Sequence, residues 1–206
     1  MSGLTIPKLC GAILLPQTVL FPHGALPLHI FEPRYRTMLD HSLSGKRLIC
    51  VGHLIADEKE PLTKCVAHIG TIALVRAARL LENGNYTLLL HGILRVRFTD
   101  WHSSEIYPLA EIQPALDTTL EADEEEKAKK TMQNALRHAL APFPKEVMAQ
   151  FQEILEQAGN AACISDALAQ QLIHDPEKRQ QLLGITDTKK RVAYLIRFLK
   201  NTSDLI

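Results

Sequence analysis

The sequence lacks an excess of charge of either sign, because Lys and Arg together number 23 and Asp and Glu together also number 23. A chain without net charge has no general electrostatic attraction to nucleic acid or to an anionic membrane. It also lacks any apolar run near the roughly 18 residues that a membrane span requires. Pro7 and Lys8 interrupt the apolar N-terminus, so a cleavable signal is not indicated. We therefore expect a cytoplasmic protein with no membrane partner, for which nucleic acid is a disfavoured partner.

Motifs of metal, phosphate and peptidase chemistry are missing as well. The four cysteines include no C-x-x-C pair, and the nine histidines include no H-E-x-x-H pattern. No G-x-x-x-x-G-K-[ST] loop is present, since the single Gly-Lys pair, Gly45-Lys46, is followed by Arg47. Ser42 and Ser44 near Lys46 fit a solvated helix end rather than a Ser-Lys dyad. We expect no metal, no cofactor and neither ATPase nor peptidase activity.

What is present changes character at about Pro114. Up to that point the sequence consists of short runs rich in Val, Ile and Leu, separated by turn signals, and this pattern predicts strands. The runs are Leu9–Leu15, Ala25–Ile30, Arg47–Leu54, Cys65–Leu81, Tyr86–Phe98 and Leu109–Ile112. Cys10, Cys50 and Cys65 lie in these runs and are interpreted as reduced core thiols. The segment IADEKEP is interpreted as a solvated loop. We expect a mostly β domain over residues 1–115.

The segment LLENGNYTLLL predicts a β-hairpin. Asn83 and Gly84 can adopt the positive φ angles of a tight turn, and apolar runs flank them on both sides. We expect Ile72–Leu81 to pair with Asn85–Arg95 in antiparallel fashion. The following HGILRVRF alternates between one face directed to a core and one wetter face that includes Arg97.

After Pro114 the apolar residues follow a helical period. The segment from Leu120 has acidic first turns and acid-before-base pairs four residues apart, and Thr118 or Thr119 is its candidate cap. Asp175-Pro176 has the pattern of an N-cap and a first helical residue. The five expected helices are one that ends at Pro142, then Lys145–Gln157, Ala161–Ile173, Pro176–Leu183 and Asp187–Asn201. Short loops between them predict a compact α-helical bundle over residues 116–206.

The stretch LPLHIFEPRYRTMLDHSL is predicted to change from strand to helix at Pro33, with Gly45 as the end of the helix. The apolar helical positions are expected to close one end of the sheet. Glu32 and Arg36, four residues apart, predict a surface ion pair worth about 0.3–0.5 kcal/mol. We interpret the polar cluster here as structural rather than catalytic; its members are His29, Glu32, Arg34 and Arg36.

Several segments, taken in order, carry a family resemblance. They are LLPQTVLFPHGALPLHIFEPRYRTML, HIGTIALV, GILRVRF, YPLAEI and SDALAQQLIHDPEKRQQLLGITDTKKRVAYLIRFL. Together they resemble the N-terminal substrate-binding domain of Lon-type ATP-dependent proteases, including the V-G-T-x-A and G-x-x-R-V-R strands of that family. The resemblance implies an α+β fold, with a PUA-like β pseudo-barrel that contains a crossover helix, followed by a helical bundle.

The resemblance also implies a function. We expect a stand-alone, non-catalytic homologue that binds polypeptides, in protein quality control or in recruiting substrates to a protease. Its expected partners are unfolded polypeptides or those with exposed apolar segments, together with a protease or chaperone, and self-association would strengthen weak binding by avidity. An apolar patch or an uncovered strand edge captures such chains by burial and added strand pairing. The ATPase and peptidase domains of a full Lon protease have no counterpart in these residues.

Candidate contacts lie in the loop TVLFPHG and the strand that follows. Apolar residues in such a turn-prone loop are either packed under a neighbour, which is the favoured interpretation, or offered to a partner. The predicted peptide-binding residues are Val19, Leu20, Phe21, Pro22, Leu28 and Phe31. RNA binding through the barrel is the alternative function, supported only by the strand arginines Arg76, Arg79, Arg95 and Arg97. A small-molecule hydrolase is a third class, with no motif behind it.

Overall fold

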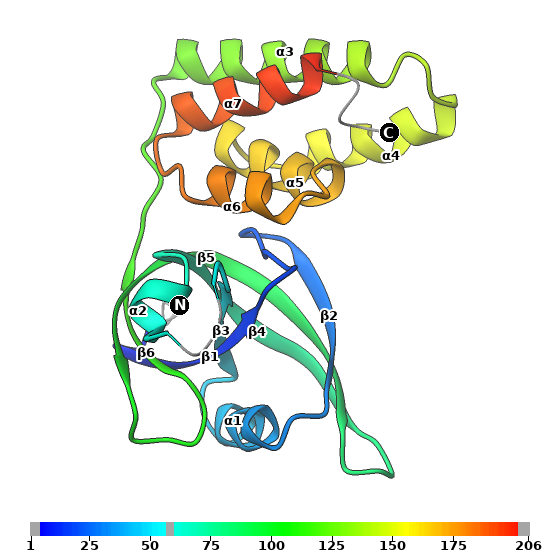
Figure 1. Ribbon diagram of the computed structural model, residues 1–206. Coiled ribbons are helices and arrows are strands. Elements are labelled where there is room, and N and C mark those ends of the chain that lie inside the picture. The colour runs from blue at the N-terminus through cyan, green and yellow to red at the C-terminus, as the bar shows by residue number, and fades with distance from the viewer. Residues whose placement is uncertain (1–4, 57–59, 202–206) are drawn as a thin grey trace. The chain divides into compact units, whose positions relative to one another are not determined.

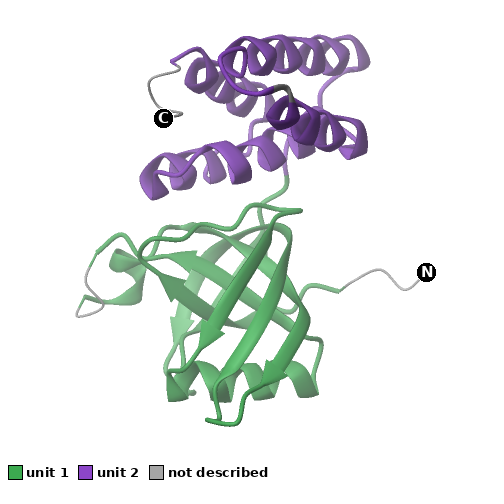
Figure 2. Cartoon of the chain, turned by 90° about the vertical axis from the view of Figure 1, so that its right-hand side faces the viewer, with its two compact units in different colours: residues 1–116 green, residues 117–206 purple. Residues whose placement is uncertain are grey.

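The computed structural model describes residues 5–56 and 60–201. The chain divides into two compact units, residues 1–116 and 117–206 (Figures 1 and 2). The described residues contain six strands and seven helices, so the predicted α+β class is confirmed. The elements are β1 (Leu9–Leu15), β2 (Ala25–Ile30), α1 (Pro33–Ser44), β3 (Leu48–His53), α2 (Leu62–Cys65), β4 (Ile69–Leu80), β5 (Tyr86–His102), β6 (Leu109–Pro114), α3 (Ala122–Ala139), α4 (Lys145–Gln157), α5 (Ala161–Leu172), α6 (Pro176–Leu183) and α7 (Thr188–Lys200). Residues 57–59 of the predicted IADEKEP loop lie outside the described residues.

The first unit is built on one sheet, with the strand order β2-β5-β4-β3-β1-β6. Neighbouring strands are antiparallel except β1 and β3, which run parallel with Ala12 opposite Cys50. The long strand β5 also pairs with β6, so β5, β4, β3, β1 and β6 form a closed ring and β2 lies outside it (Figure 1). Among the described strands β2 therefore pairs with β5 alone, and no strand lies along its other edge.

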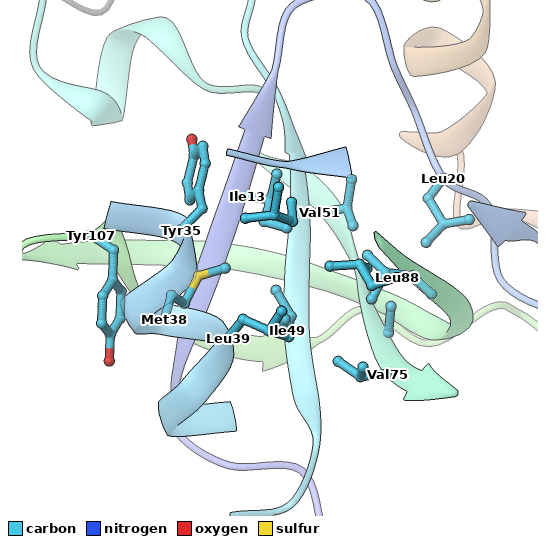
Figure 3. Close-up of a cluster of buried hydrophobic side chains, with 13 residues drawn as sticks. Ile13, Leu20, Tyr35, Met38, Leu39, Ile49, Val51, Val75, Leu88 and Tyr107 are labelled. Atoms are coloured by element: carbon cyan, nitrogen blue, oxygen red, sulfur yellow. The ribbon is translucent and has the colours of Figure 1, made fainter. Parts of the chain in front are cut away.

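Helix α1 forms where the sequence predicts it. It begins at Pro33, whose fixed φ suits a first helical residue, and it ends before Gly45. Its buried side chains, Tyr35, Met38 and Leu39, pack against β1 and β3 in a core shared with β4 and β5 (Figure 3). The opposite face of the sheet contributes a second core, and the prediction that Cys10, Cys50 and Cys65 are buried thiols is confirmed.

The predicted ion pair between Glu32 and Arg36 is wrong. Glu32 accepts a hydrogen bond from Nε of Arg34 at 2.9 Å, while Nη1 of Arg36 donates to the carbonyl oxygen of Gly84 at 3.1 Å. A second bond, from the Tyr86 hydroxyl to Oδ1 of Asp40, has a length of 2.7 Å. Both Arg36 and Asp40 belong to α1, so this helix is joined to the hairpin between β4 and β5.

That hairpin has the predicted antiparallel pairing, with Leu80 opposite Tyr86. Its turn differs from the prediction, because only Gly84 adopts a positive φ, of 77°, and Asn83 does not. The Gly84 N–H donates to the carbonyl of Leu81 at 2.9 Å, and the Leu81 N–H donates to the carbonyl of Asn85 at 2.8 Å. This is the three-residue hairpin loop in which a type I turn is followed by a left-handed residue, the position that favours glycine.

The second unit consists of α3 to α7, and α7 packs against both α3 and α5. The bounds of α4 to α7 agree with the prediction to within one residue, and the Asp175 side chain caps α6 by accepting from the N–H groups of Glu177 and Lys178. The prediction that Thr118 or Thr119 caps the first helix of this unit is wrong, since its N-cap is Glu121. The Thr118 hydroxyl instead accepts from the N–H of Thr188 at 3.0 Å, at the start of α7.

A buried arginine holds the helical unit together. Arg191 is fully buried and makes a bidentate pair with Asp117, with N–O distances of 2.7 and 2.8 Å. It also donates to the hydroxyl of Ser165 at 3.0 Å and to the carbonyl of Ile185 at 2.7 Å, and Oδ1 of Asp166 lies 3.4 Å from its Nε. One side chain thus joins α7, α5, the loop before α7 and the first residue of the unit.

Candidate polypeptide-binding surface

Four of the six predicted peptide-binding residues are buried. Val19, Leu20 and Phe21 are at most 2% exposed, and Pro22 is buried as well. The favoured interpretation of this loop, packing under a neighbour, describes the place of these residues in the structure. A polypeptide could reach these side chains only if the core opened.

The loop that contains Phe21 is buried because its backbone packs closely against Thr71 on β4 and Gly92 on β5. The Thr71 hydroxyl donates to the carbonyl of Leu20 at 2.5 Å, and Gly92 exchanges backbone hydrogen bonds with His23 and Gly24, each 2.9 Å long. A Cβ atom at Gly92 would collide with the carbonyl oxygen of Phe21. Glycine inside a strand signals such a close backbone approach, so Gly92 was the clue in the sequence that this loop packs on β5.

The other two predicted residues lie at the strand that forms the open edge. Leu28 on β2 is half-buried and packs against the α1 core, whereas Phe31, just after β2, is 61% exposed. The Phe31 ring stacks on His29, with a centroid distance of 6.4 Å and an interplanar angle of 25°. Polypeptide contacts at these two positions stay a prediction.

The backbone of β2 offers hydrogen-bonding groups on its open side. Gly92 donates to the carbonyl of Gly24, so the alternation of an antiparallel strand turns the backbone of Leu26 and Leu28 toward β5. Ala25, Pro27 and His29 therefore direct their backbone groups away from β5. Proline has no N–H, so Pro27 occupies a position where no bond to β5 is lost, and it removes one donor from the open edge.

The exposed face of β2, β5 and β4 carries side chains in three cross-strand rows. The register aligns Pro27, Leu89 and Ala77 in the middle row, all exposed and apolar. One flanking row contains His29, Thr87 and Arg79. The other aligns Ala25, His91 and the half-buried Leu74, and Arg76 in the bulge of β4 and His23 lie near enough to act on the charge of His91. We call these residues except Leu74, together with Phe31, the β2 surface: His23, Ala25, Pro27, His29, Phe31, Arg76, Ala77, Arg79, Thr87, Leu89 and His91.

No residue of the β2 surface is acidic, and several are cationic or can become so. His91 shows the effect, because partial burial and the positive charges of Arg76 and His23 lower the pKa of its imidazole. His29 approaches the amide of Asn85 with an N–N distance of 3.4 Å. The β2 surface thus combines an apolar centre with basic flanks in a chain whose net charge is zero.

The strand arginines divide between core and surface. Arg95 is 2% exposed and therefore cannot serve the RNA contacts that it was predicted to support. Arg76, Arg79 and Arg97 are exposed, and the first two belong to the β2 surface while Arg97 lies beyond it on β5. Of the four strand arginines that supported the alternative function, three are therefore exposed and one is buried.

Other features of the described residues suit a polypeptide less well. A cavity of about 240 Å³ lies between β1 and α1, and its lining includes Cys10, Met38 and Tyr107, the last joined to His41 by a hydrogen bond of 2.9 Å. This volume is below that of typical drug-sized sites. No three His, Cys, Asp or Glu side chains in the part of the chain that the structure describes could hold a metal ion together. The same residues include no helix long and apolar enough to cross a bilayer.

This chain is similar in sequence to part of several Lon proteases. The curated relatives include the Lon protease of Anaeromyxobacter dehalogenans, 24% identical over 204 residues, and Lon protease 2 of Herpetosiphon aurantiacus, 26% identical over 200 residues. These matches cover 98% and 93% of this chain but 24% of each relative, so the chain spans about a quarter of the length of the curated relatives it matches.

Two solved structures show the same fold. The N-terminal domain of the Lon protease from the Mycobacterium avium complex has a TM-score of 0.76 at 14% identity, and a Lon N-terminal domain protein from Xanthomonas campestris has a TM-score of 0.65 at 19% identity. Each similarity covers at least 93% of this chain and 99% of the other. The family model of the ATP-dependent protease La (LON) substrate-binding domain matches residues 11–201, and the chain therefore belongs to the LON substrate-binding domain family.

Proposed function

We propose that this chain is a non-catalytic module that binds extended, apolar segments of other polypeptides along strand β2, in protein quality control or in delivering substrates to a protease. The observation that carries the proposal is an exposed apolar row next to a strand edge that no other described strand covers. Membership of the LON substrate-binding domain family supports the same class of ligand. As part of the same proposal, we infer that the β unit is a PUA-like pseudo-barrel and that the helices of the second unit form a bundle.

The physical basis is a combination of apolar burial and strand addition. An unfolded segment paired with the open edge of β2 would pack its side chains on Phe31 and across Pro27 toward Leu89, which is 39% exposed, while its backbone bonds to the outward-facing groups of Ala25 and His29. Pro27 removes one donor from this edge, and proline on an edge strand discourages uncontrolled pairing. The edge therefore favours weak, reversible capture, in the micromolar range or above once the costs of association are included.

The hairpin that carries this row is held in place. Arg36 and Asp40 of α1 bond to Gly84 and Tyr86 of the hairpin, as described above. The hydrogen bond to Asp40 raises the pKa of the Tyr86 hydroxyl, with smaller effects of desolvation and of the Asp40 charge, so this phenol remains a donor at neutral pH. A surface fixed in this way loses little conformational entropy on binding.

The test is a titration of labelled α-lactalbumin, kept unfolded by reduction and alkylation, against the protein and its variants. The double variant Phe31→Ser, Leu89→Ser should weaken binding at least about tenfold, since burial of such side chains is worth about 1.5–3 kcal/mol each and 1.4 kcal/mol is tenfold. The matched control is Ile106→Ser, which removes a side chain that is 67% exposed and lies outside the β2 surface. Equal affinities of the double variant and the control would contradict the proposal.

A further inference from the structure

We propose that the β2 surface selects extended segments with the pattern acidic-x-apolar-x-acidic, an inference that rests on the proposed function and names its substrate class. The apolar residue would lie next to Pro27 and Leu89, and the two acidic residues would lie next to the flanking rows. The juxtaposition that carries the inference is one apolar row between two rows that each include basic side chains, on three paired strands.

The spacing of the rows sets the spacing of the pattern. Side chains on one face of a strand recur every second residue, about 6.6–6.8 Å apart. A segment paired with the open edge of β2 continues the sheet, so its exposed-face residues line up with Ala25, Pro27 and His29 in turn. The residue beside Pro27 meets the apolar row, and the residues two positions before and after it meet basic rows.

Each flanking row supplies positive charge from more than one element. Beside Ala25 lies His91 on β5, and Arg76 in the bulge of β4 and His23 in the loop before β2 are near enough to act on His91. Beside His29 lies Arg79, two register positions across the sheet through Thr87. Negative charge on the ligand would complement both rows, whereas a basic ligand would be repelled by both.

The protonation of His91 predicts a pH dependence of ligand binding, which is a second test of the inference. The register neighbours of His91, Ala25 and Leu74, are uncharged, and burial, together with the nearby Arg76 and His23, lowers its pKa. A carboxylate of the ligand placed next to the same groups would offset that repulsion, so binding should take up protons. Ligand carboxylates have pKa values of about 4.3 and stay ionised. The affinity for an acidic ligand should therefore rise as the pH falls from about 8 to about 6.

The experiment compares labelled seven-residue peptides by fluorescence anisotropy at low ionic strength. The probe has the sequence Thr-Glu-Thr-Leu-Thr-Glu-Thr; in two others Gln or Lys replaces both Glu residues, and in a fourth Ser replaces Leu. Because exposed ion pairs are individually weak, the acidic peptide should bind about threefold to tenfold more tightly than the Gln peptide. The Lys and Ser peptides should be the weakest.

Variants assign the effect to named residues. The double variant Arg76→Gln, Arg79→Gln should reduce the preference for Glu over Gln to less than about twofold, while the matched control Arg97→Gln, an exposed arginine of β5 outside the β2 surface, keeps it. His91→Gln should weaken the pH dependence of binding. Equal binding of the Glu, Gln and Lys peptides would overturn the inference.

The remaining outcomes separate the inference from the proposed function. If unfolded α-lactalbumin binds and the peptides show no acidic preference, the inference fails and the proposed function stands. If neither α-lactalbumin nor any peptide binds, both fail. If a single-stranded oligouridine displaces the acidic peptide and itself binds more tightly, with a loss in the double arginine variant, the basic rows belong to nucleic acid and the inference is overturned.

Discussion

His91 is a residue whose protonation the fold opposes, because burial, Arg76 and His23 lower its pKa in the folded state. Its pKa in the unfolded chain is near the ordinary value of about 6.5. Below that pH the unfolded state binds the proton more readily, so the contribution of His91 to stability is present above the unfolded pKa and is lost as the pH falls through the folded pKa. His91→Gln should therefore make the loss of stability between pH 7 and pH 5 less steep.

The measurement is urea unfolding at several pH values, followed by the fluorescence of Trp101, the only tryptophan of the chain. Trp101 lies in the β unit and contacts Phe98, with a ring centroid distance of 4.9 Å, so its signal reports this unit. An unchanged pH slope in the variant would show that His91 does not govern this part of the acid response.

At the level of the single element, helix α1 is anchored by its buried face, which packs against β1 and β3. Leu39 is 1% exposed and packs in the core that α1 shares with β1 and β3. Leu39→Ala should therefore cost about 2–5 kcal/mol in the free energy of unfolding. Pro33→Ala, at the exposed first position of the same helix, should be mild because a first helical residue needs no special packing. The urea midpoint from Trp101 fluorescence measures both changes, and an unmoved midpoint for Leu39→Ala would mean that the helix is not anchored by its buried face.

Helix ends are the features of single elements that the sequence predicts best. The ends of α1 and α6 follow from Pro33, Gly45 and Asp175, whose effects are local, so they are read correctly from neighbouring residues. The Thr118 cap failed because Thr118 bonds to Thr188, 70 residues away. Local patterns describe helix ends well because the hydrogen bonds that cap them span two to four residues.

The candidate site depends on contacts that are distant in sequence. The loop that contains Phe21 is buried by Thr71 and Gly92, from strands that follow it by more than 50 residues. Leu89 looks like one more apolar residue in a hydrophobic run, and only the register with Pro27 and Ala77 puts it on the exposed face. Period two predicts which residues share a face, but it cannot say which face is covered.

At the scale of the whole molecule, the two units should respond separately to the loss of Arg191. Arg191→Ala would leave the buried carboxylate of Asp166 and the half-buried carboxylate of Asp117 without this partner. Removing one member of a buried ion pair costs about 3–5 kcal/mol. The cost should fall on the helical unit, which contains all of these residues, and the β unit has cores of its own.

Two signals can follow the units in one urea titration. Far-UV circular dichroism is dominated by helix, most of which lies in residues 117–206, whereas Trp101 fluorescence reports the β unit. In Arg191→Ala the circular dichroism transition should move to lower urea while the fluorescence transition stays in place. Lys189→Ala, which breaks only the exposed pair between Lys189 and Glu124, should leave both transitions where they are. If Arg191→Ala moved the two transitions together, the units would unfold as one cooperative body, and the division at residues 116 and 117 would hold for the folded structure but not for its unfolding.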